Sequence, residues 1–305
     1  MMTISESYYR KMYLIRRTEE TIENLFSKGL LRGTTHGCRG QEAIAVGLLQ
    51  YVDPKKDYIT GTHRSHGHYI ALSDDPYPLI AELMGKKTGL VNGRGGSQHI
   101  RYFNFFTNGI TGGLIPIAVG IAYSLKLQKT DFIVTSFIGD GAMNEGYVLE
   151  ALNLAGCYNV PIVFVLENNT FAMSTITSNF TSGNFENRVK SFNIEYHFLE
   201  ANDIFLISDL SKEIILKVRN YRSPIFIEFK THRFSGHSKS DNRAYVPEEL
   251  DEYWINNDPL IKLRNSLTIE VVKNIENSVD NLINNSVEKA LNDPYPEPFE
   301  EYENY

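Results

Sequence analysis

The middle of the chain alternates between two kinds of hydrophobic pattern. Residues Phe132 to Ile138 and Val160 to Leu166 form short apolar runs, which are typical of buried strands. Residues Ile115 to Gln128 and Asn144 to Cys157 show the longer, interrupted pattern of helices. Because strands that alternate with helices indicate a parallel sheet covered by helices, we expect an α/β fold of three layers.

Similar patterns extend the predicted sheet in both directions. Before the central elements, a glycine-rich turn in "HGCRGQEAIAVGLLQYV" leads into a helix, and "DYITGTHRSHGHYIAL" is expected to be a short strand followed by the helix "PLIAELMGKKTGL". After them, strands near "YHFLEAND" and "PIFIEFKTHRF" flank a helix from Ser208 to Asn220. Three long polar loops, "VNGRGGSQHIRYFNFFTNGITGGLIP", "ENNTFAMSTITSNFTSGNFENRVKSF" and "SGHSKSDNRAYVP", are expected to be functional.

We expect one domain, residues 1–305, with helical extensions at both ends. The first 26 residues predict an amphipathic helix within an N-terminal arm, residues 1–32. The C-terminal part, residues 247–305, begins with a helix start at Pro247 and ends in the acidic, Pro-rich tail "DPYPEPFEEYENY". Between them, Thr268 to Leu291 repeats apolar residues at helical spacing, namely Ile269, Val272, Ile275, Val279, Leu282 and Val287.

Composition narrows the class of protein. Hydrophobic residues make up 42% of the chain and charged residues 22%, as in an ordinary soluble globular protein. The net charge of −7 argues against nucleic-acid binding, and the longest apolar stretch, Leu114 to Leu125, is too short to cross a membrane. Cys38 and Cys157, both expected to be buried, suit a reducing compartment. We therefore expect a cytoplasmic protein.

An aspartate between two glycines, Gly139-Asp140-Gly141, ends the first central strand. In parallel sheets ligands bind beyond the carboxyl ends of the strands, and glycines let the backbone approach a ligand closely. The next strand ends at Asn168-Asn169, and strands joined in this way usually lie near each other, so Asp140 and Asn169 are expected to meet. An acid beside an anion site requires a cation, and two oxygen ligands suit Mg²⁺. Taken singly, either feature is also typical of a turn.

The run "GDGAMNEGYVLEALNLAGCYNVPIVFVLENN" resembles the thiamine-diphosphate motif, which opens with GDG and closes with NN. With "THRSHGH", "GRGGSQHI", "NGITGGLIPIAVG" and "GHSKSD", it resembles the alpha subunit of the thiamine-diphosphate-dependent 2-oxo acid dehydrogenases of the pyruvate, branched-chain and acetoin types. The resemblance covers about Arg39 to Pro247. It implies the thiamine-diphosphate-binding fold, and specifically the half that holds the diphosphate.

The resemblance also implies two cofactors, thiamine diphosphate and Mg²⁺, and a set of residues that bind them. The Mg²⁺ ligands would be Asp140, Asn169 and the backbone carbonyl of Phe171, where relatives often have tyrosine. Arg64 would hold the diphosphate, because a permanently charged fork suits phosphate oxygens. Relatives often have tyrosine in place of His63 and an aliphatic residue in place of Thr111. The complete cofactor-binding set is His63, Arg64, Gly109, Ile110, Thr111, Asp140, Gly141, Ala142, Asn169, Phe171, Met173 and His237.

Histidines supply the candidates for proton transfer. His237 resembles the family histidine beside the diphosphate and the reacting centre, and imidazole can transfer a proton near neutral pH. We take His237 as the first catalytic candidate and His66 as the second. Without the resemblance, His237 would be interpreted as a solvated loop residue. The spacing of His63, His66 and His68 also suggests zinc, but no cysteine or acid near them in the sequence completes the ligand set.

The resemblance implies decarboxylation of a 2-oxo acid, or cleavage of acetoin, with transfer of the acyl group to a lipoyl or other acceptor. It also implies a beta subunit that carries the glutamate activating the aminopyrimidine ring, in an alpha2-beta2 heterotetramer, and a lipoyl acyltransferase as a further partner. A thiamine-dependent carbon-carbon lyase or ligase subunit is the alternative. A non-catalytic scaffold subunit is a third hypothesis, against which the retained Asp140, Asn169, Arg64 and His237 count.

Overall fold

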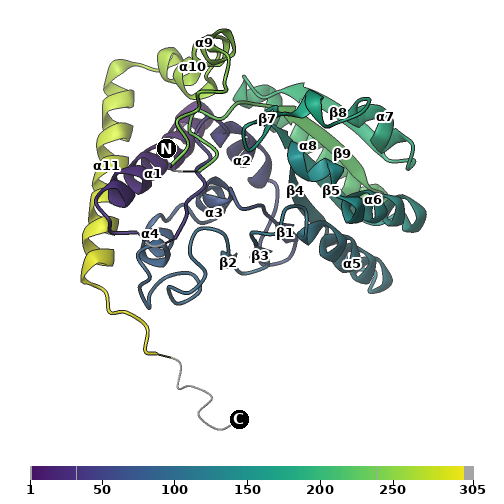
Figure 1. The fold of residues 1–305 in the computed structure, drawn as a ribbon, viewed down its shortest axis with the longest axis horizontal. Coiled ribbons are helices and arrows are strands. Elements are labelled where there is room, and N and C mark those ends of the chain that lie inside the picture. Colours follow the sequence, from purple (N-terminus) through teal and green to yellow (C-terminus); the bar gives the residue numbers. More distant parts are fainter. Residues whose placement is uncertain (1, 32, 239, 299–305) are drawn as a thin grey trace.

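In the computed structural model, which describes residues 2–31, 33–238 and 240–298, the protein is built around a seven-stranded sheet (Figure 1). The strand order is β2-β3-β1-β4-β5-β9-β8, and all neighbours pair in parallel except β2 and β3. The strands are β1 Tyr58–Thr60, β2 Arg101–Tyr102, β3 Phe105–Phe106, β4 Val134–Gly139, β5 Ile162–Asn168, β8 Glu195–Glu200 and β9 Ile225–Lys230. The prediction of an α/β fold with a mostly parallel sheet is confirmed.

The side chains of the central strands alternate between two hydrophobic cores, as expected for strands buried on both faces. Val163 and Val165 of β5 belong to one core, whereas Phe164 and Leu166 belong to the other. The smaller core includes helices α5 Leu114–Leu127, α6 Gly146–Tyr158 and α7 Phe185–Lys190. The larger core includes α1 Ile4–Ser27, α2 Glu42–Leu49, α3 His66–Ser73, α4 Tyr77–Leu83, α8 Ile204–Tyr221, α10 Pro259–Ser266 and α11 Ile269–Asn292.

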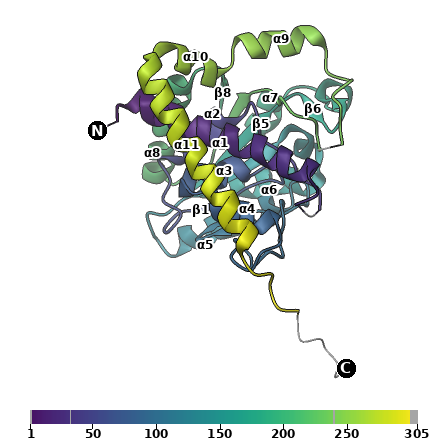
Figure 2. The same ribbon diagram turned by 90° about the vertical axis from the view of Figure 1, so that its left-hand side faces the viewer.

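The terminal helices pack on the outside of the larger core, where α11 lies across α1 (Figure 2). Thr3 caps α1, because its hydroxyl accepts a hydrogen bond from the Glu6 amide at 3.2 Å. On α11, Val272 and Val279 of the predicted apolar repeat are buried, but Ile269, the first residue of the helix, is 75% exposed. Residues 1, 32 and 299–305 of the predicted arm and tail lie outside the described residues.

A buried cluster of charges fixes α1 to its neighbours. The Arg16 guanidinium bonds the Glu42 carboxylate on α2 and lies 3.0 Å from Asp258, which caps α10. All three side chains are almost completely buried. Removal of the cation would leave two buried carboxylates facing each other without compensation.

Three local predictions were wrong. The strand predicted in "DYITGTHRSHGHYIAL" ends at Thr60, and His66 and His68 lie on helix α3, because the Ser65 hydroxyl accepts a hydrogen bond from the Thr62 amide and forms a turn. The long loops contain short strands, β2, β3, β6 Phe171–Ala172 and β7 Thr175–Ile176, besides helix α7. Cys157 is exposed rather than buried, since it lies on the outer side of α6.

The third loop leads to α9 Glu248–Asn256, whose Trp254 is buried against the His232 ring. No helix among residues 2–31, 33–238 and 240–298 combines the length and the apolar character needed to cross a membrane.

Candidate active site

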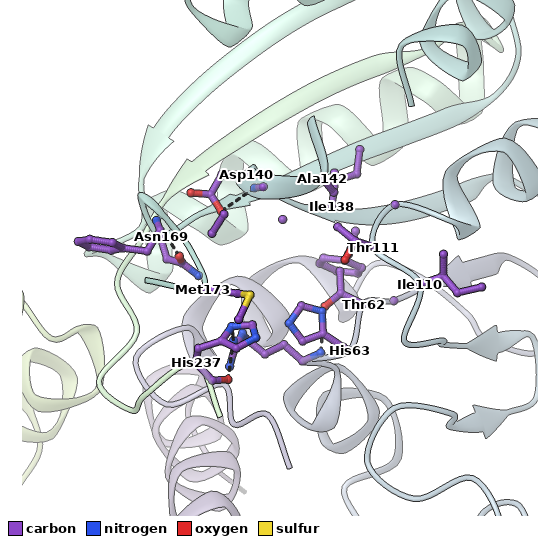
Figure 3. Close-up of a pocket in the computed structure, with 18 of the residues that line it drawn as sticks. Thr62, His63, Ile110, Thr111, Ile138, Asp140, Ala142, Asn169, Met173 and His237 are labelled. Carbon is purple, nitrogen blue, oxygen red and sulfur yellow. Dashed lines mark hydrogen bonds between the residues drawn. The ribbon is translucent and has the colours of Figure 1, made fainter. Parts of the chain in front are cut away.

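A cavity of about 140 Å³ lies where the carboxyl ends of β1, β4, β5 and β9 meet (Figure 3). Asp140 and Asn169 lie on one side of this cavity, and His63 and His237 lie on the other. The sequence-predicted residues that line it are His63, Arg64, Ile110, Thr111, Asp140, Gly141, Ala142, Asn169, Phe171, Met173 and His237. Gly109 and His66 do not line it. The structure therefore brings together residues from five separate segments of the chain.

Asp140 begins the short 3-10 helix Asp140–Asn144 that follows β4, and it is only 3% exposed. Its carboxylate accepts hydrogen bonds from the Gly141 amide at 3.0 Å and from the Thr177 hydroxyl at 2.5 Å. Burial raises the pKa of Asp140, because no cation bonds directly to it among the described residues. A cation in the cavity would reverse this effect.

Asn169 follows β5, which pairs with β4 so that Gly139 lies opposite Glu167. The turn after β5 is held by β9, because Glu228 of β9 accepts a hydrogen bond from the Asn168 side-chain amide at 2.7 Å. The Asn169 side-chain oxygen accepts a hydrogen bond from the Phe171 amide at 3.2 Å and keeps further acceptor capacity. As the strand order predicted, a carboxylate and an amide oxygen thus face one cavity.

Two buried arginines give the cavity a positive charge. Arg64 is 6% exposed and donates hydrogen bonds to the carbonyls of Gly37 at 2.8 Å and His237 at 2.9 Å. Arg233 is 5% exposed and donates to the carbonyl of Ser235 and the hydroxyl of Tyr245. Within the described part of the chain neither guanidinium forms an ion pair with a carboxylate, although buried charges are usually paired. The arrangement is that of a site for an anion.

Arg233 was missed in the sequence. It lies three residues beyond β9, and β9 pairs with β5. A basic residue shortly after the last predicted parallel strand was the available signal, because the carboxyl ends of such strands converge. Burial, with the nearby Arg233 charge, lowers the pKa of Arg64 to about 9.

Three imidazoles surround Arg64. The rings of His36, His63 and His237 lie 4.9 to 5.7 Å apart between centroids. Burial and the Arg64 charge lower the pKa of His63 to about 2 and those of His36 and His237 to about 4. All three rings are therefore neutral at pH 7, and the buried Nε2 of His63 has no hydrogen-bond partner among the described residues. His36 was not predicted, and no local pattern around it distinguishes it.

The bond between Arg64 and His237 defines the tautomer of this imidazole. Arg64 lies 3.1 Å from His237 Nδ1, and a guanidinium can only donate. Nδ1 therefore accepts, and the proton of the neutral ring is on Nε2. The Asp241 carboxylate, which accepts from the His237 amide at 2.6 Å, holds this loop in place.

The other histidines of the "THRSHGH" motif lie behind the cavity. His66 is completely buried and contacts Glu19 and Ser97, whereas His68 contacts Ser65 and Glu167. Hence the three imidazoles considered for zinc have separate partners. In the described ranges, no group of three or more His, Cys, Asp or Glu side chains is arranged to hold a metal ion. The pair Asp140 and Asn169, with one carboxylate and one amide oxygen, is not a metal site of that kind.

The mouth of the cavity is apolar and exposed. Ile110 is 66% exposed and Met173 is 64% exposed. Gly112 allows the tight path of this segment, because its φ is +72° and a Cβ there would lie 2.7 Å from Val148. Gly109 lies beside Gln98, outside the cavity.

Together, the parallel sheet, the two arginines that form no ion pair among the described residues and the acid–amide pair are the features of an anion site at the carboxyl edge of a parallel sheet. The family model described as "Dehydrogenase E1 component" matches residues 10–299. The chain therefore belongs to the dehydrogenase E1 component family, as its motifs predicted, and membership implies thiamine diphosphate as the cofactor.

Similar proteins have related names. The alpha subunit of the pyruvate dehydrogenase E1 component of Zymomonas mobilis is 35% identical over 265 residues, which are 85% of this chain and 75% of the relative. The alpha subunit of the acetoin:2,6-dichlorophenolindophenol oxidoreductase of Cupriavidus necator is 38% identical, over 83% of this chain and 77% of the relative. The protein of the same name from Bacillus subtilis is 35% identical, over 94% and 89%. The predicted class, an oxidoreductase component of the alpha-subunit type, is confirmed.

Proposed function

We propose that the chain is the alpha subunit of a thiamine-diphosphate-dependent 2-oxo acid or acetoin dehydrogenase and holds the diphosphate of the cofactor in the cavity. One observation carries this proposal: two buried arginines, which form no ion pair within the described part of the chain, face the same cavity as Asp140 and Asn169. A diphosphate supplies the missing negative charge. The proposal includes the thiamine-diphosphate-binding fold for a single domain, residues 1–305, with residues 1–32 and 247–305 as arms, and a cytoplasmic location.

The residues of the cavity fit this cofactor with Mg²⁺. Asp140, Asn169 and the carbonyl of Phe171 would supply oxygen ligands, and phosphate oxygens with water would complete the octahedron. Arg64 and Arg233 would neutralise the phosphates, and Nε2 of His63, which has no partner in the described ranges, would bond a phosphate oxygen. The backbone of Gly141 and Ala142 adds amide donors at the start of the helical segment after β4.

The same chain would position the rest of the cofactor and the reacting groups. Ile110 and Thr111, which line the cavity, would lie beside the aminopyrimidine ring, with Gly109 preceding them in the same segment outside the cavity, and Met173 would lie near the thiazolium ring. When bound, thiamine diphosphate supplies the carbon centre at which the bond next to the substrate carbonyl is broken.

His237 is the proposed acid–base residue. Its Nε2 holds the proton in the neutral ring, and this atom is available to donate to an oxygen of the substrate. A diphosphate beside Arg64 would reduce the positive field at the ring, so the pKa of His237 would rise toward neutrality from about 4. Arg64 would thus both bind the anion and orient the imidazole.

A beta subunit is the proposed partner. The relatives are named alpha subunits, and the only carboxylate that lines the cavity within the described residues is Asp140, the proposed metal ligand. The glutamate that activates the aminopyrimidine would come from the partner, across the exposed apolar mouth at Ile110 and Met173. We propose an alpha2-beta2 heterotetramer that passes the acyl group to a lipoyl acyltransferase.

The test is an assay of the chain co-purified with its beta subunit. Pyruvate, branched-chain 2-oxo acids and acetoin would be supplied with 2,6-dichlorophenolindophenol as the electron acceptor. We expect dye reduction with at least one substrate, dependent on added thiamine diphosphate and Mg²⁺ and abolished by Asp140→Ala. A complex that binds the cofactor yet forms only a carbon-carbon product would instead identify a lyase or ligase.

A further inference from the structure

A chain of buried hydrogen bonds connects the N-terminal helix to the wall of the cavity. It starts at Glu19 on α1, which is 1% exposed. The Glu19 carboxylate lies 3.0 Å from His66 Nδ1 and accepts hydrogen bonds from the amide of Cys38 at 3.3 Å and its thiol at 3.1 Å. Burial alone would raise the pKa of Glu19, but His66 and Cys38 together hold it below its usual value. Glu19 is therefore a buried carboxylate whose partners all come from other segments.

His66 connects Glu19 to Ser97. Because the Glu19 carboxylate only accepts, Nδ1 of His66 carries a proton. Its Nε2 lies 2.9 Å from the Ser97 hydroxyl, which also accepts a hydrogen bond from the His36 amide at 3.4 Å. Ser97 is 4% exposed and belongs to the glycine-rich segment between α4 and β2. The network thus has donors and acceptors in matching order from Glu19 to the backbone of His36.

The segment His36 to Cys38 is held from two sides. Glu19 bonds it at Cys38, and a Cβ on Gly37 would lie 3.0 Å from a Glu19 carboxylate oxygen. On the other side, the Gly37 carbonyl accepts the hydrogen bond from Arg64. The same segment places the His36 ring against the rings of His63 and His237. The position of Arg64 and of the imidazole cluster therefore depends on a carboxylate outside the cavity.

We propose that Glu19 is a positioning residue for the anion site: through His66, Ser97 and the segment His36 to Cys38 it fixes Arg64 for the diphosphate. His66, which the sequence suggested as a catalytic residue, acts in this chain of contacts and not on the substrate. The inference rests on the proposed function, since it assumes that the cavity binds a diphosphate. It also makes α1, part of the N-terminal arm, a component of the site.

The test uses the complex of this chain with its beta subunit and measures binding of inorganic pyrophosphate and of thiamine diphosphate by titration calorimetry with Mg²⁺. Glu19→Gln keeps the size of the side chain but removes the charge that holds His66. We expect both dissociation constants to rise about 10- to 100-fold, the loss found when a group that orients a ligand is changed. Glu20→Gln is the matched control, because Glu20 is the adjacent residue, a third exposed, and bonds Arg17. It should change neither constant by more than about twofold.

A second variant keeps the proposal testable if Glu19→Gln does not fold. Ser97→Ala removes only one hydroxyl and should weaken pyrophosphate binding as well, and the double variant should lose less than the product of the two single effects. A merely structural role predicts a lower melting temperature with unchanged dissociation constants below it, and this result would overturn the proposal. If the unchanged complex binds neither pyrophosphate nor thiamine diphosphate, the proposed function itself fails and this inference fails with it.

Discussion

Replacement of Arg64 by methionine separates the contribution of this residue to the fold from its contribution to binding the diphosphate. The pKa of this guanidinium falls from 12.5 to about 9, which corresponds to about 5 kcal/mol of cost for holding the buried cation. Arg64→Met removes this cost but leaves the carbonyls of Gly37 and His237 without their donor, at about 1 to 3 kcal/mol each. The two effects nearly cancel. We expect the melting temperature of the ligand-free alpha–beta complex to change by only a few degrees, in either direction.

Binding should respond very differently. Loss of one partner of a buried charge pair costs about 2 to 5 kcal/mol, so the dissociation constant of thiamine diphosphate should rise about 30-fold to several thousand-fold. Titration calorimetry of the alpha–beta complex at fixed Mg²⁺ measures this, and Arg39→Met is the control because Arg39 pairs with Glu23 outside the cavity. If Arg64→Met lowers the melting temperature by more than about 10 °C and leaves the cofactor affinity intact, Arg64 serves the fold and our reasoning is wrong.

Three further predictions concern the scaffold and its pH dependence. Gly93→Ala should lower the melting temperature by several degrees more than Gly96→Ala. Both glycines have a positive φ, but only at Gly93 would a Cβ meet backbone atoms, at 2.4 Å. Equal losses of melting temperature would exclude this close approach. Arg16→Met should lower the free energy of unfolding, measured with denaturant, by about 3 to 5 kcal/mol, because it leaves two buried carboxylates without their cation. Arg17→Met, nearer the surface, should lower it by no more than about 1 kcal/mol. The reverse order would refute the role of the buried charge cluster. Burial lowers the pKa of His36 from 6.5 to about 4, so the folded form binds fewer protons than the unfolded form between these pH values and the free energy of unfolding falls as pH falls. His36→Asn should reduce the dependence of the free energy of unfolding on pH by about 1.4 kcal/mol per pH unit. An unchanged pH dependence would contradict the assignment.

The part of the site that follows from strand order could be predicted. Asp140 and Asn169 end two strands with clear apolar patterns, and one helix separates them, so the rules of parallel sheets place them together. Arg64, His63 and His237 were found only because the motifs around them resemble a family. Composition and spacing alone gave them no distinguishing signal.

The rest depends on contacts between distant segments. Arg233 lines the cavity, and the His36 ring packs against the rings of His63 and His237. No local pattern around His36 records that contact. The sequence pattern placed His66 and His68 at the end of a strand. They lie on a buried helix because Glu19 and Glu167, far away in the sequence, satisfy their ring nitrogens.

The central claim is that a divalent cation bridges the diphosphate to the ends of β4 and β5. A crystal structure of the alpha–beta complex grown with thiamine diphosphate and Mn²⁺, in place of Mg²⁺, tests it most directly, because Mn²⁺ gives an anomalous signal. We predict one anomalous peak within bonding distance of the Asp140 carboxylate, the Asn169 side-chain oxygen and the Phe171 carbonyl, with the phosphates against Arg64. A peak elsewhere, or a cofactor bound away from Asp140, would contradict the account.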